Sequence, residues 1–338
     1  MIPSLAEHPW QYVSLALAPP VTVFVLYPLW KKCQTQAMSL RHQHFMITGG
    51  SSGIGRALAL EVARRGGNVT IVARNKNRLE DVKLELLDAA KTPEQAMHVI
   101  SADLAGGVPG LIREVNDAED YCGPVDFLVN CAGSAISGRF EETPVADFEQ
   151  MMDMNYMTAV HATKIVVPIM KQRGRGSVTF VASVAGIVGL YGFTAYCPSK
   201  FALVGFAQAL RMEVVHHGID VTVAFPPHTD TPGFSEEEKC KPTETKLICG
   251  GGGLFTAERV ARSMLQDILQ RNFLSPIGFE SRFVLTLCAG MMPSNSFLDM
   301  TIQVLTMGLL RLLGLCYLRR VYGIVARCAT KSKGKGSL

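Results

Sequence analysis

"HFMITGGSSGIGRALALEVARRGGNVTIVAR", residues 44–74, is the stretch that decides the fold. It begins with a short apolar segment that ends at Ile47, and a glycine-rich turn follows. Next comes a segment of helical character to about Arg65, and then a second apolar segment over residues 69–73. A strand, a helix and another strand in this order predict a βαβ unit with parallel strands.

The glycine-rich turn is a candidate site for a pyrophosphate group. Its glycines allow the backbone to turn tightly and to approach a ligand, whose charge then meets the free N–H groups where the helix begins. The spacing G-x-x-x-G-x-G differs from G-x-G-x-x-G, so the place of the turn between a strand and a helix carries the argument. The candidate residues are Gly49, Ser51, Ser52, Gly53, Ile54 and Gly55.

The end of the second strand predicts which dinucleotide is bound. About 20 residues after the glycines, a carboxylate would hold the ribose 2′-hydroxyl of NAD, but Ala73 and Arg74 stand there instead. Arg74 can pair with a 2′-phosphate, and Arg78 is a second candidate one turn further on. The sequence therefore predicts NADPH as the cofactor. Asp103, which closes the apolar segment "HVISAD", is a candidate for contact with the adenine or a cap for a loop.

Two further apolar segments, "VDFLVNCAG" and "GSVTFVAS", have the pattern of buried parallel strands. Ser183 ends the second segment, so we expect it at the carboxyl edge of the sheet, where ligands bind. In "AYCPSK", residues 195–200, Pro198 predicts the first turn of a helix. Tyr196 and Lys200 then lie one turn apart on one face of that helix.

Ser183, Tyr196 and Lys200 suit the reduction of a ketone. A ketone that receives a hydride becomes an alkoxide and needs a proton, which a tyrosine can deliver if its pKa falls from about 10 toward neutrality. We expect the Lys200 ammonium, together with the positive charge of oxidised nicotinamide, to lower the pKa of Tyr196. Ser183 is expected to hydrogen-bond the carbonyl oxygen and hold it in line.

Together, "TGGSSGIG", "NCAG", Ser183 and the Tyr196–Lys200 pair resemble the short-chain dehydrogenase/reductase family over about residues 42–270. The resemblance implies an α/β fold with a Rossmann-type doubly wound parallel sheet, in a single NADP-binding catalytic domain over residues 42–272. It also implies that Asn155, in "MDMNYM", extends the proton relay through a water, and that Asn130 braces the central strand beside the cofactor. No ligand-spaced Cys/His cluster occurs in the sequence, so no metal is expected.

Within the family, "GLYGFTAYCPSK", "FPPHTDTPGFSEEEKCKPTETKLI" and "TMGLLR" resemble the members that reduce the 3-keto group of a long-chain sphingoid base with NADPH. The partners implied are a keto-sphingoid base and the endoplasmic reticulum membrane, with the catalytic domain in the cytosol. His228, the glycine run at 250–253 and the late start of the N-terminal segment depart from that pattern.

The loop after Pro226 is the expected lid over the substrate, since prolines stiffen its base and residues 239–253 are polar and then glycine-rich. Glu236, Glu237 and Glu238 could attract the ammonium of a sphingoid base. A run of three glutamates is more typical of a solvated helix face, and this interpretation is favoured.

The N-terminal segment, residues 1–32, is expected to be a membrane anchor. Tyr12 to Trp30 carries no charge, and Lys31 and Lys32 follow at once. A 19-residue helix rises about 28 Å, close to the roughly 30 Å of bilayer hydrocarbon. The lysines would hold the catalytic domain in the cytosol. A re-entrant or interfacial segment is the alternative, because Pro19 and Pro20 interrupt the run.

The C-terminal tail, residues 273–338, contains two apolar runs of ten residues, "FVLTLCAGMM" and "TIQVLTMGLL". We expect a loop with Pro293 and Asp299 to separate them, and each run is too short to span a bilayer alone. Arginines and lysines follow, which favours a pair of helices lying against an anionic leaflet. Helices that cover the core or a dimer interface are the alternative, and a homo-oligomer remains open.

Composition excludes some classes of function. The chain has 338 residues, 48% of them apolar, and a net charge of +4, which is too small to indicate a nucleic-acid partner. Nine scattered cysteines without a C-x-x-C pair indicate reduced thiols and no structural zinc. Two other functions share the motifs: a membrane-anchored reductase of a steroid or retinoid, and a non-enzymatic nucleotide-binding scaffold, which would not require Ser183, Tyr196 and Lys200.

Overall fold

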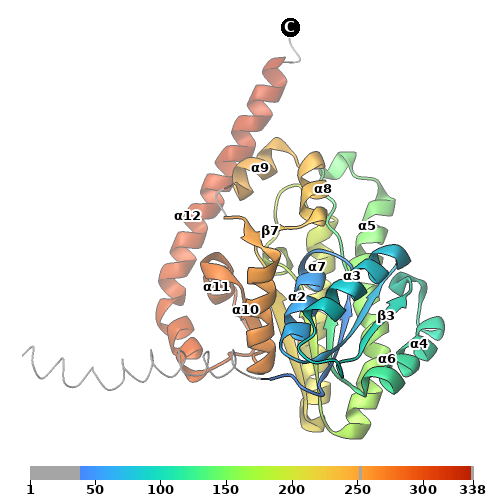
Figure 1. Ribbon diagram of the computed structural model, residues 1–338. Helices are drawn as coiled ribbons and strands as arrows, with labels where there is room; N and C mark the ends of the chain where they lie inside the picture. Colours follow the sequence, from blue (N-terminus) through green and yellow to red (C-terminus); the bar gives the residue numbers. More distant parts are fainter. Residues whose placement is uncertain (1–38, 251–252, 336–338) are drawn as a thin grey trace, which may run out of the picture. The chain divides into compact units, whose positions relative to one another are not determined.

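The computed structural model describes residues 39–250 and 253–335. Within them, a seven-stranded sheet has the order β3-β2-β1-β4-β5-β6-β9, and every neighbouring pair is parallel (Figure 1). The strands are β1 (His44–Thr48), β2 (Asn68–Ala73), β3 (Met97–Ser101), β4 (Val125–Asn130), β5 (Gly176–Val181), β6 (Ile219–Phe225) and β9 (Leu274–Pro276). The strand order reverses between β1 and β4, as in a doubly wound sheet, so the predicted fold class is confirmed.

Helices cover both faces of this sheet. The α-helices of the described residues are α2 (Gly53–Arg64), α3 (Lys76–Ala89), α4 (Pro109–Cys122), α5 (Val145–Met152), α6 (Thr158–Arg173), α7 (Tyr196–Val214), α8 (Pro232–Cys240), α9 (Thr243–Cys249), α10 (Ala257–Leu269), α11 (Gly278–Leu287) and α12 (Phe297–Lys335). On β1, Phe45 and Ile47 join a core with α2, α3 and α10, whereas Met46 joins a second core with α4, α6 and α7. The alternation of side chains along a strand therefore feeds two cores.

The elements predicted from residues 44–74 and from "AYCPSK" are confirmed. A strand, α2 and a second parallel strand follow one another as the βαβ pattern requires. Tyr196 is the first residue of α7, and Pro198 lies in the first turn, where its missing N–H removes no hydrogen bond. Gly218 ends the helical segment in the left-handed region, at a φ of 70°.

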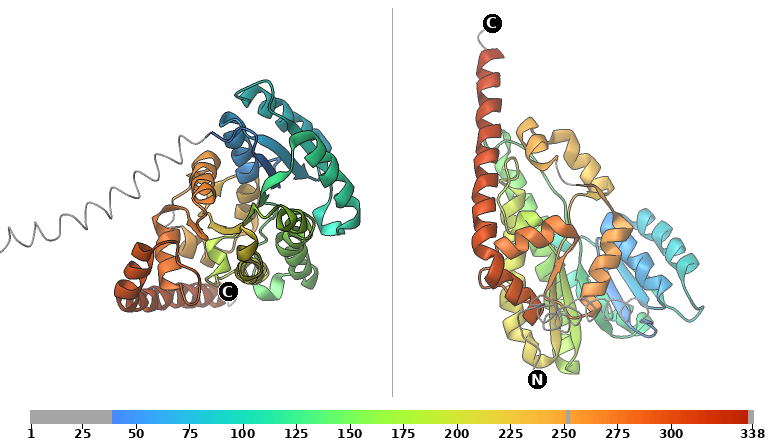
Figure 2. Two further views of the ribbon diagram at one scale, coloured as in Figure 1. Left: turned by 90° about the horizontal axis from the view of Figure 1, so that it is seen from below. Right: turned by 90° about the vertical axis from the view of Figure 1, so that its left-hand side faces the viewer.

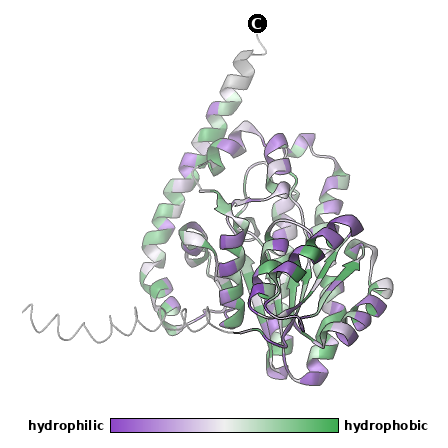
Figure 3. Ribbon diagram, viewed as in Figure 1, coloured by the Kyte–Doolittle hydropathy of each residue, from purple (hydrophilic) through white to green (hydrophobic). Residues whose placement is uncertain are grey.

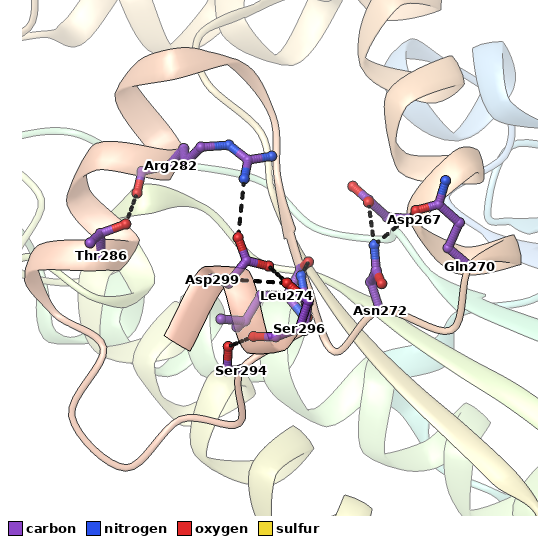
Figure 4. Close-up of polar contacts among 10 residues, drawn as sticks. Asp267, Gln270, Asn272, Leu274, Arg282, Thr286, Ser294, Ser296 and Asp299 are labelled. Carbon is purple, nitrogen blue, oxygen red and sulfur yellow. Dashed lines mark hydrogen bonds and ion pairs between the residues drawn. The ribbon is translucent and has the colours of Figure 1, made fainter. Parts of the chain in front are cut away.

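The sheet extends past residue 272, where the catalytic domain was expected to end. Leu274, in β9, exchanges two hydrogen bonds with the Asn295 side chain, at 2.9 Å to its N–H and 2.6 Å to its carbonyl oxygen. Asp299 pairs with Arg282 at 3.6 Å, and its backbone N–H donates to the Ser296 hydroxyl at 3.1 Å (Figure 4). These contacts fix the start of α12 to the edge of the sheet and to α11.

α12 corrects the interpretation of the tail. The first apolar run contributes to α11, as a short helix, but the second belongs to a single 39-residue helix that has Asp299 in its first turn. After Pro293, no proline interrupts the sequence, so the helix continues through the arginines. Its stretch Phe297–Thr330 is long and apolar enough to cross a membrane by length and composition. An 18-residue window within this stretch has a mean hydropathy of 1.6, and 6% of the window is buried.

Many apolar side chains of α12 are exposed, and Figure 3 shows hydrophobic residues on this helix with hydrophilic ones between them. Val304, Leu305 and Leu309 are 74%, 77% and 63% exposed. Another side packs on α11 and α9, which lie beside it in both sets of views (Figures 1 and 2). Gly314 permits this approach, because a Cβ there would lie 2.8 Å from a methyl group of Leu287.

The expected lid contains two short helices, α8 and α9, which follow the small strand β7 (Thr229–Asp230). β7 pairs in parallel with β8 (Phe255–Thr256), so both ends of the segment are held together. We call residues 232–249, which comprise α8 and α9, the lid. The anchor predicted over residues 1–32 and part of the glycine run at 250–253 lie outside the described residues.

Candidate active site

The glycine-rich turn joins β1 to α2 and needs glycine at several positions. Gly49 has a φ of 68°, and a Cβ there would lie 2.8 Å from the Cα of Ala132, beyond the end of β4. A Cβ on Gly55 would lie 2.5 Å from the carbonyl oxygen of Gly49. The turn is therefore packed backbone to backbone. All six predicted residues line a cavity: Gly49, Ser51, Ser52, Gly53, Ile54 and Gly55.

The residues predicted to bind the adenosine end of the cofactor and to favour NADP over NAD line the same cavity. Arg74 and Arg78 are exposed at the end of β2 and at the start of α3, where Asn75 caps the helix by accepting the N–H of Arg78 at 3.0 Å. Asp103 accepts the N–H of Ala105 at 3.1 Å, so it caps a short turn and also lines the cavity. Two guanidinium groups thus lie at this end of the cavity, and no carboxylate ends β2. Their contact with a 2′-phosphate stays a prediction.

Ser183, Tyr196 and Lys200 converge on the cavity from two elements. Ser183 lies two residues beyond β5, and a hydrogen bond joins its side chain to that of Tyr196, at the start of α7. The Lys200 ammonium donates to the carbonyl oxygen of Val181 at 2.9 Å and lies 5.8 Å from the centre of the Tyr196 ring. The end of β5 and the first turn of α7 therefore assemble the predicted trio.

The pKa of Tyr196 differs from the expectation. Burial raises it above its ordinary value, and the hydrogen bond with Ser183 opposes that rise only in part. Burial also lowers the pKa of Lys200 to about 8, while Cys131 acts in the opposite direction. The lysine contacts a backbone carbonyl instead of the phenol, which explains why it does not dominate the Tyr196 pKa. The tyrosine is thus protonated at neutral pH, as a proton donor must be.

Asn155 is buried behind the cavity in a π-helical turn, Asp153–Met157, between α5 and α6. Its amide accepts the N–H of Ser134 and donates to the carbonyl oxygen of Ser134, both at 3.0 Å, and it donates to the Ser199 hydroxyl at 3.0 Å. A Cβ on Gly133 would lie 2.4 Å from the Asn155 oxygen and 3.4 Å from the Lys200 ammonium. Asn155 therefore fixes the segment after β4 beside Lys200. The water relay stays a prediction.

Asn130 ends β4 but does not line the cavity, in contrast to the predicted contact with the cofactor. It is 3% exposed and donates to the Thr163 hydroxyl at 3.1 Å, which ties β4 to α6. Sequence reasoning missed Thr48, whose hydroxyl accepts the N–H groups of Cys131 and Ala132 at 3.0 and 3.1 Å. Thr48 thereby sets the path of the chain after β4. The only signal for it was its place directly before the glycine-rich turn.

The cavity has a volume of about 960 Å³ and extends well beyond the reaction centre. Its far part is formed by the lid, α11 and α12, and most of the side chains that line it are apolar. The lining residues there include Phe234, Ile248, Phe283, Leu287, Tyr317 and Leu318. One continuous space thus connects the glycine-rich turn, the tyrosine hydroxyl and an apolar end. Among the described residues, no group of His, Cys, Asp or Glu side chains is suited to hold a metal ion.

The fold and these contacts define a doubly wound α/β domain that carries a glycine-rich turn and a buried tyrosine on one cavity at the edge of its sheet. A family model for short chain dehydrogenase matches residues 43–241, which is more than half of the chain. The chain belongs to the short-chain dehydrogenase family of oxidoreductases, and the resemblance drawn from its motifs is confirmed.

Curated relatives match over most of their length. A protein of Danio rerio named 3-dehydrosphinganine reductase is 43% identical over 306 residues, covering 90% of this chain and 92% of its own. A 3-ketodihydrosphingosine reductase of Bos taurus is 42% identical with the same coverage. A protein of Dictyostelium discoideum with that name is 33% identical and covers 85% of this chain and 89% of its own. The predicted resemblance to this group of reductases is confirmed.

Solved structures share the fold. A short-chain dehydrogenase from Sphingobium yanoikuyae in complex with NADPH has a TM-score of 0.61 and 25% identity, and the match covers 71% of this chain and 91% of that one. Levodione reductase has a TM-score of 0.62 and 23% identity, with coverage of 68% and 91%. Both cover nearly all of the solved chain but only about two thirds of this one.

Proposed function

We propose that this protein reduces the 3-keto group of 3-ketodihydrosphingosine to give dihydrosphingosine, with NADPH as the reductant, as a step in sphingolipid synthesis. The observation that carries the proposal is the single cavity, which joins the glycine-rich turn and Tyr196 to an apolar end. A dinucleotide and a long hydrocarbon chain need such a continuous space. The names of relatives that cover nine tenths of the chain support the same substrate.

The residues of the glycine-rich turn and the ends of β2 and β3 fit NADPH. Glycine is required where the turn packs against Ala132, and the start of α2 provides N–H groups for a pyrophosphate. Arg74 and Arg78 would hold the 2′-phosphate, and Asp103 the adenine end. When bound, NADPH supplies the hydride. The related Sphingobium dehydrogenase was solved with NADPH, which supports the same cofactor here.

The reaction follows from the surroundings of Tyr196. Ser183 holds the substrate's carbonyl oxygen in line with the phenol, which is protonated because burial raises its pKa. As the carbonyl carbon is reduced, the oxygen takes the phenol proton and the C–O double bond becomes an alcohol. The Lys200 ammonium then lies close enough to stabilise the tyrosinate. Asn155 acts as a positioning residue, because it fixes the segment of Gly133 and Ser134 against Lys200.

The test is a side-by-side assay of the purified protein with a keto-sphingoid base, a steroid ketone and retinal, each with NADPH and with NADH. We expect the keto-sphingoid base with NADPH to be reduced with by far the highest kcat/KM. Faster reduction of the steroid or of retinal would assign the chain to another substrate. No turnover of any of the three, with NADPH still bound, would support a scaffold.

We also propose that α12 contacts the endoplasmic reticulum membrane with its exposed apolar side, and that the catalytic domain faces the cytosol. The exposed Val304, Leu305 and Leu309 support lipid contact, because water would otherwise cover them. Carbonate extraction of a form that lacks residues 1–32 tests the helix, since we expect this form to stay with membranes. A fully soluble truncated form would show that α12 covers another protein surface. Protease added to sealed microsomes tests the orientation, and protection of the catalytic domain would contradict it.

A further inference from the structure

The substrate part of the cavity is lined by two carboxylates, Glu237 on α8 and Glu280 on α11. The three-glutamate run on α8 was expected to be a solvated face, and the structure corrects this. The side chain of Glu236 is 70% exposed and that of Glu238 is 40% exposed, but that of Glu237 is only 12% exposed. One of the three therefore points inward, since neighbouring positions of a helix face different directions.

This wall of the cavity carries an excess of negative charge. The Lys241 ammonium lies 2.8 Å from Glu237 and is also paired with Glu238, so one cation faces two carboxylates. Glu280 adds a further negative charge close to His228, whose pKa is lowered by burial and by Lys241, so that the ring is neutral at neutral pH. The cation Arg311 also lines the cavity, but it lies toward Cys288, the residue that follows α11.

Glu237 and Tyr196 both line this cavity. The charge of Glu237 is among the causes that raise the pKa of Tyr196, so the two groups interact across the same space. The backbone of α8 is held there by the Ser137 hydroxyl, which donates to the carbonyl oxygen of Glu237 at 3.3 Å. In a 3-keto-sphingoid base, the carbon that carries the ammonium is bonded directly to the keto carbon. A carboxylate near the proton donor can therefore reach that ammonium.

We propose that Glu237 binds the ammonium group of the substrate and thereby selects a cationic keto lipid over neutral ones. This inference rests on the proposed function and adds the residue that recognises the substrate's charge. Glu237 shares its carboxylate between Lys241 and the substrate, while Glu238 keeps Lys241 paired. Glu280 adds to the negative electrostatic potential on this side of the cavity. A neutral ketone gains nothing from these charges, because the attraction requires a cation.

The experiment compares Glu237→Gln with Glu238→Gln, using 3-ketodihydrosphingosine and its neutral N-acetyl derivative as substrates. Both changes remove one partner of Lys241, but Glu238 does not line the cavity. We expect Glu237→Gln to raise KM for the cationic substrate at least about tenfold, as loss of one charge-assisted contact implies, and to leave KM for the N-acetyl substrate within about twofold. Glu238→Gln should leave both KM values within about twofold.

Equal losses on both substrates, or equal losses in both variants, would overturn the role of Glu237 while leaving the proposed function intact. A wild-type protein that fails to reduce 3-ketodihydrosphingosine would overturn both. Titration with NADPH checks that each variant is folded. Glu237→Asp provides a second variant, because it keeps the charge and should recover part of the lost preference for the cationic substrate. Failure of Glu237→Asp to do better than Glu237→Gln would count against the proposal.

Discussion

The reaction centre and the lid each bury one lysine, and the two lysines have opposite surroundings. Lys200 is 5% exposed, and within the part of the chain that the structure describes its ammonium contacts a backbone carbonyl and no carboxylate, so burial lowers its pKa to about 8. Lys241 is 6% exposed. Burial acts against its charge too, but the hydrogen bonds that its ammonium donates to the carboxylates of Glu237 and Glu238 outweigh that effect and raise the pKa of Lys241. Equal burial therefore gives opposite shifts, and the partners decide the direction.

The charge of Lys200 is available to ligands, whereas the charge of Lys241 is already neutralised by its carboxylate partners. Among the described residues, Lys200 has no anionic partner, so it can respond to a tyrosinate or to a bound nucleotide. Lys241 is held by two carboxylates and by the rings of Phe193 and Phe234, at 5.8 and 5.0 Å, so it serves to hold the lid together. Substitutions should therefore affect chemistry at the first site and stability at the second.

The largest effect is expected from Tyr196→Phe, which removes the proton donor and leaves both lysines in place. Turnover should fall by roughly 10²- to 10⁴-fold, the range for loss of a positioned acid, while NADPH still binds. Single-turnover kinetics with a fluorescence titration of NADPH would measure both. Tyr156→Phe is the matched control, since that ring packs on Phe206 away from the cavity. Near-normal turnover of Tyr196→Phe would contradict its assignment as the donor.

Exchanging each lysine for methionine tests the comparison directly. Lys200→Met should weaken NADPH binding and turnover but preserve folding, because an apolar chain replaces a buried charge that has no carboxylate partner. Lys241→Met should leave NADPH affinity unchanged and lower the free energy of unfolding by about 3 kcal/mol, since a buried pair loses its cation. Exposure of Glu238 screens part of that cost. Urea unfolding would measure it, and equal stability losses in the two variants would break the comparison.

Arg74→Asp changes a charge outside both regions, at the nucleotide end of the cavity. Affinity for NADPH should fall by about tenfold or more, because an attraction for the 2′-phosphate becomes a repulsion. Affinity for NADH should hold or improve, since a carboxylate can accept the 2′-hydroxyl. Fluorescence titration of both cofactors measures this. Equal loss for the two would show that Arg74 acts through structure and not through the phosphate.

The smallest effect is expected from pH. The pKa of Lys200 is lowered to about 8, so its ammonium form predominates below pH 8 and is lost as pH rises above it. NADPH affinity of the free protein should therefore fall several-fold between pH 7 and pH 9. Lys241 should not contribute, because its pKa is raised. In Lys200→Met the affinity should not change with pH over this range, and a retained decline would assign the titration to another group.

The glycine-rich turn and the residues around Tyr196 could be predicted because their sequence patterns are local. The glycine spacing, the apolar strands and the proline in "AYCPSK" each fix a short piece of backbone, and parallel strands bring Ser183 and Tyr196 to one edge. The role of Thr48 could not be predicted, because a threonine at the end of a strand has no distinctive sequence pattern. Its importance comes from two backbone N–H groups more than 80 residues away in the chain.

The part of the molecule that forms the far end of the cavity could not be predicted in the same way, because its structure depends on packing between distant segments. β9 has three residues, too few for a periodic pattern, and its place is decided by β6 and Asn295. The inward direction of the Glu237 side chain depends on the orientation of α8 and on the ion pair between Glu237 and Lys241. The raised pKa of Tyr196 depends on the depth of its burial, which no spacing in the sequence reveals.

α12 has one side on the cavity and another exposed and apolar, and this arrangement has a kinetic consequence. If the outer side of α12 contacts lipid, the substrate reaches the cavity by diffusing within a membrane. The substrate is then diluted by other lipids and not by water. Adding inert phospholipid at constant total substrate should then slow turnover. The rate should follow the substrate's mole fraction in the bilayer, so that the relevant KM is a surface concentration.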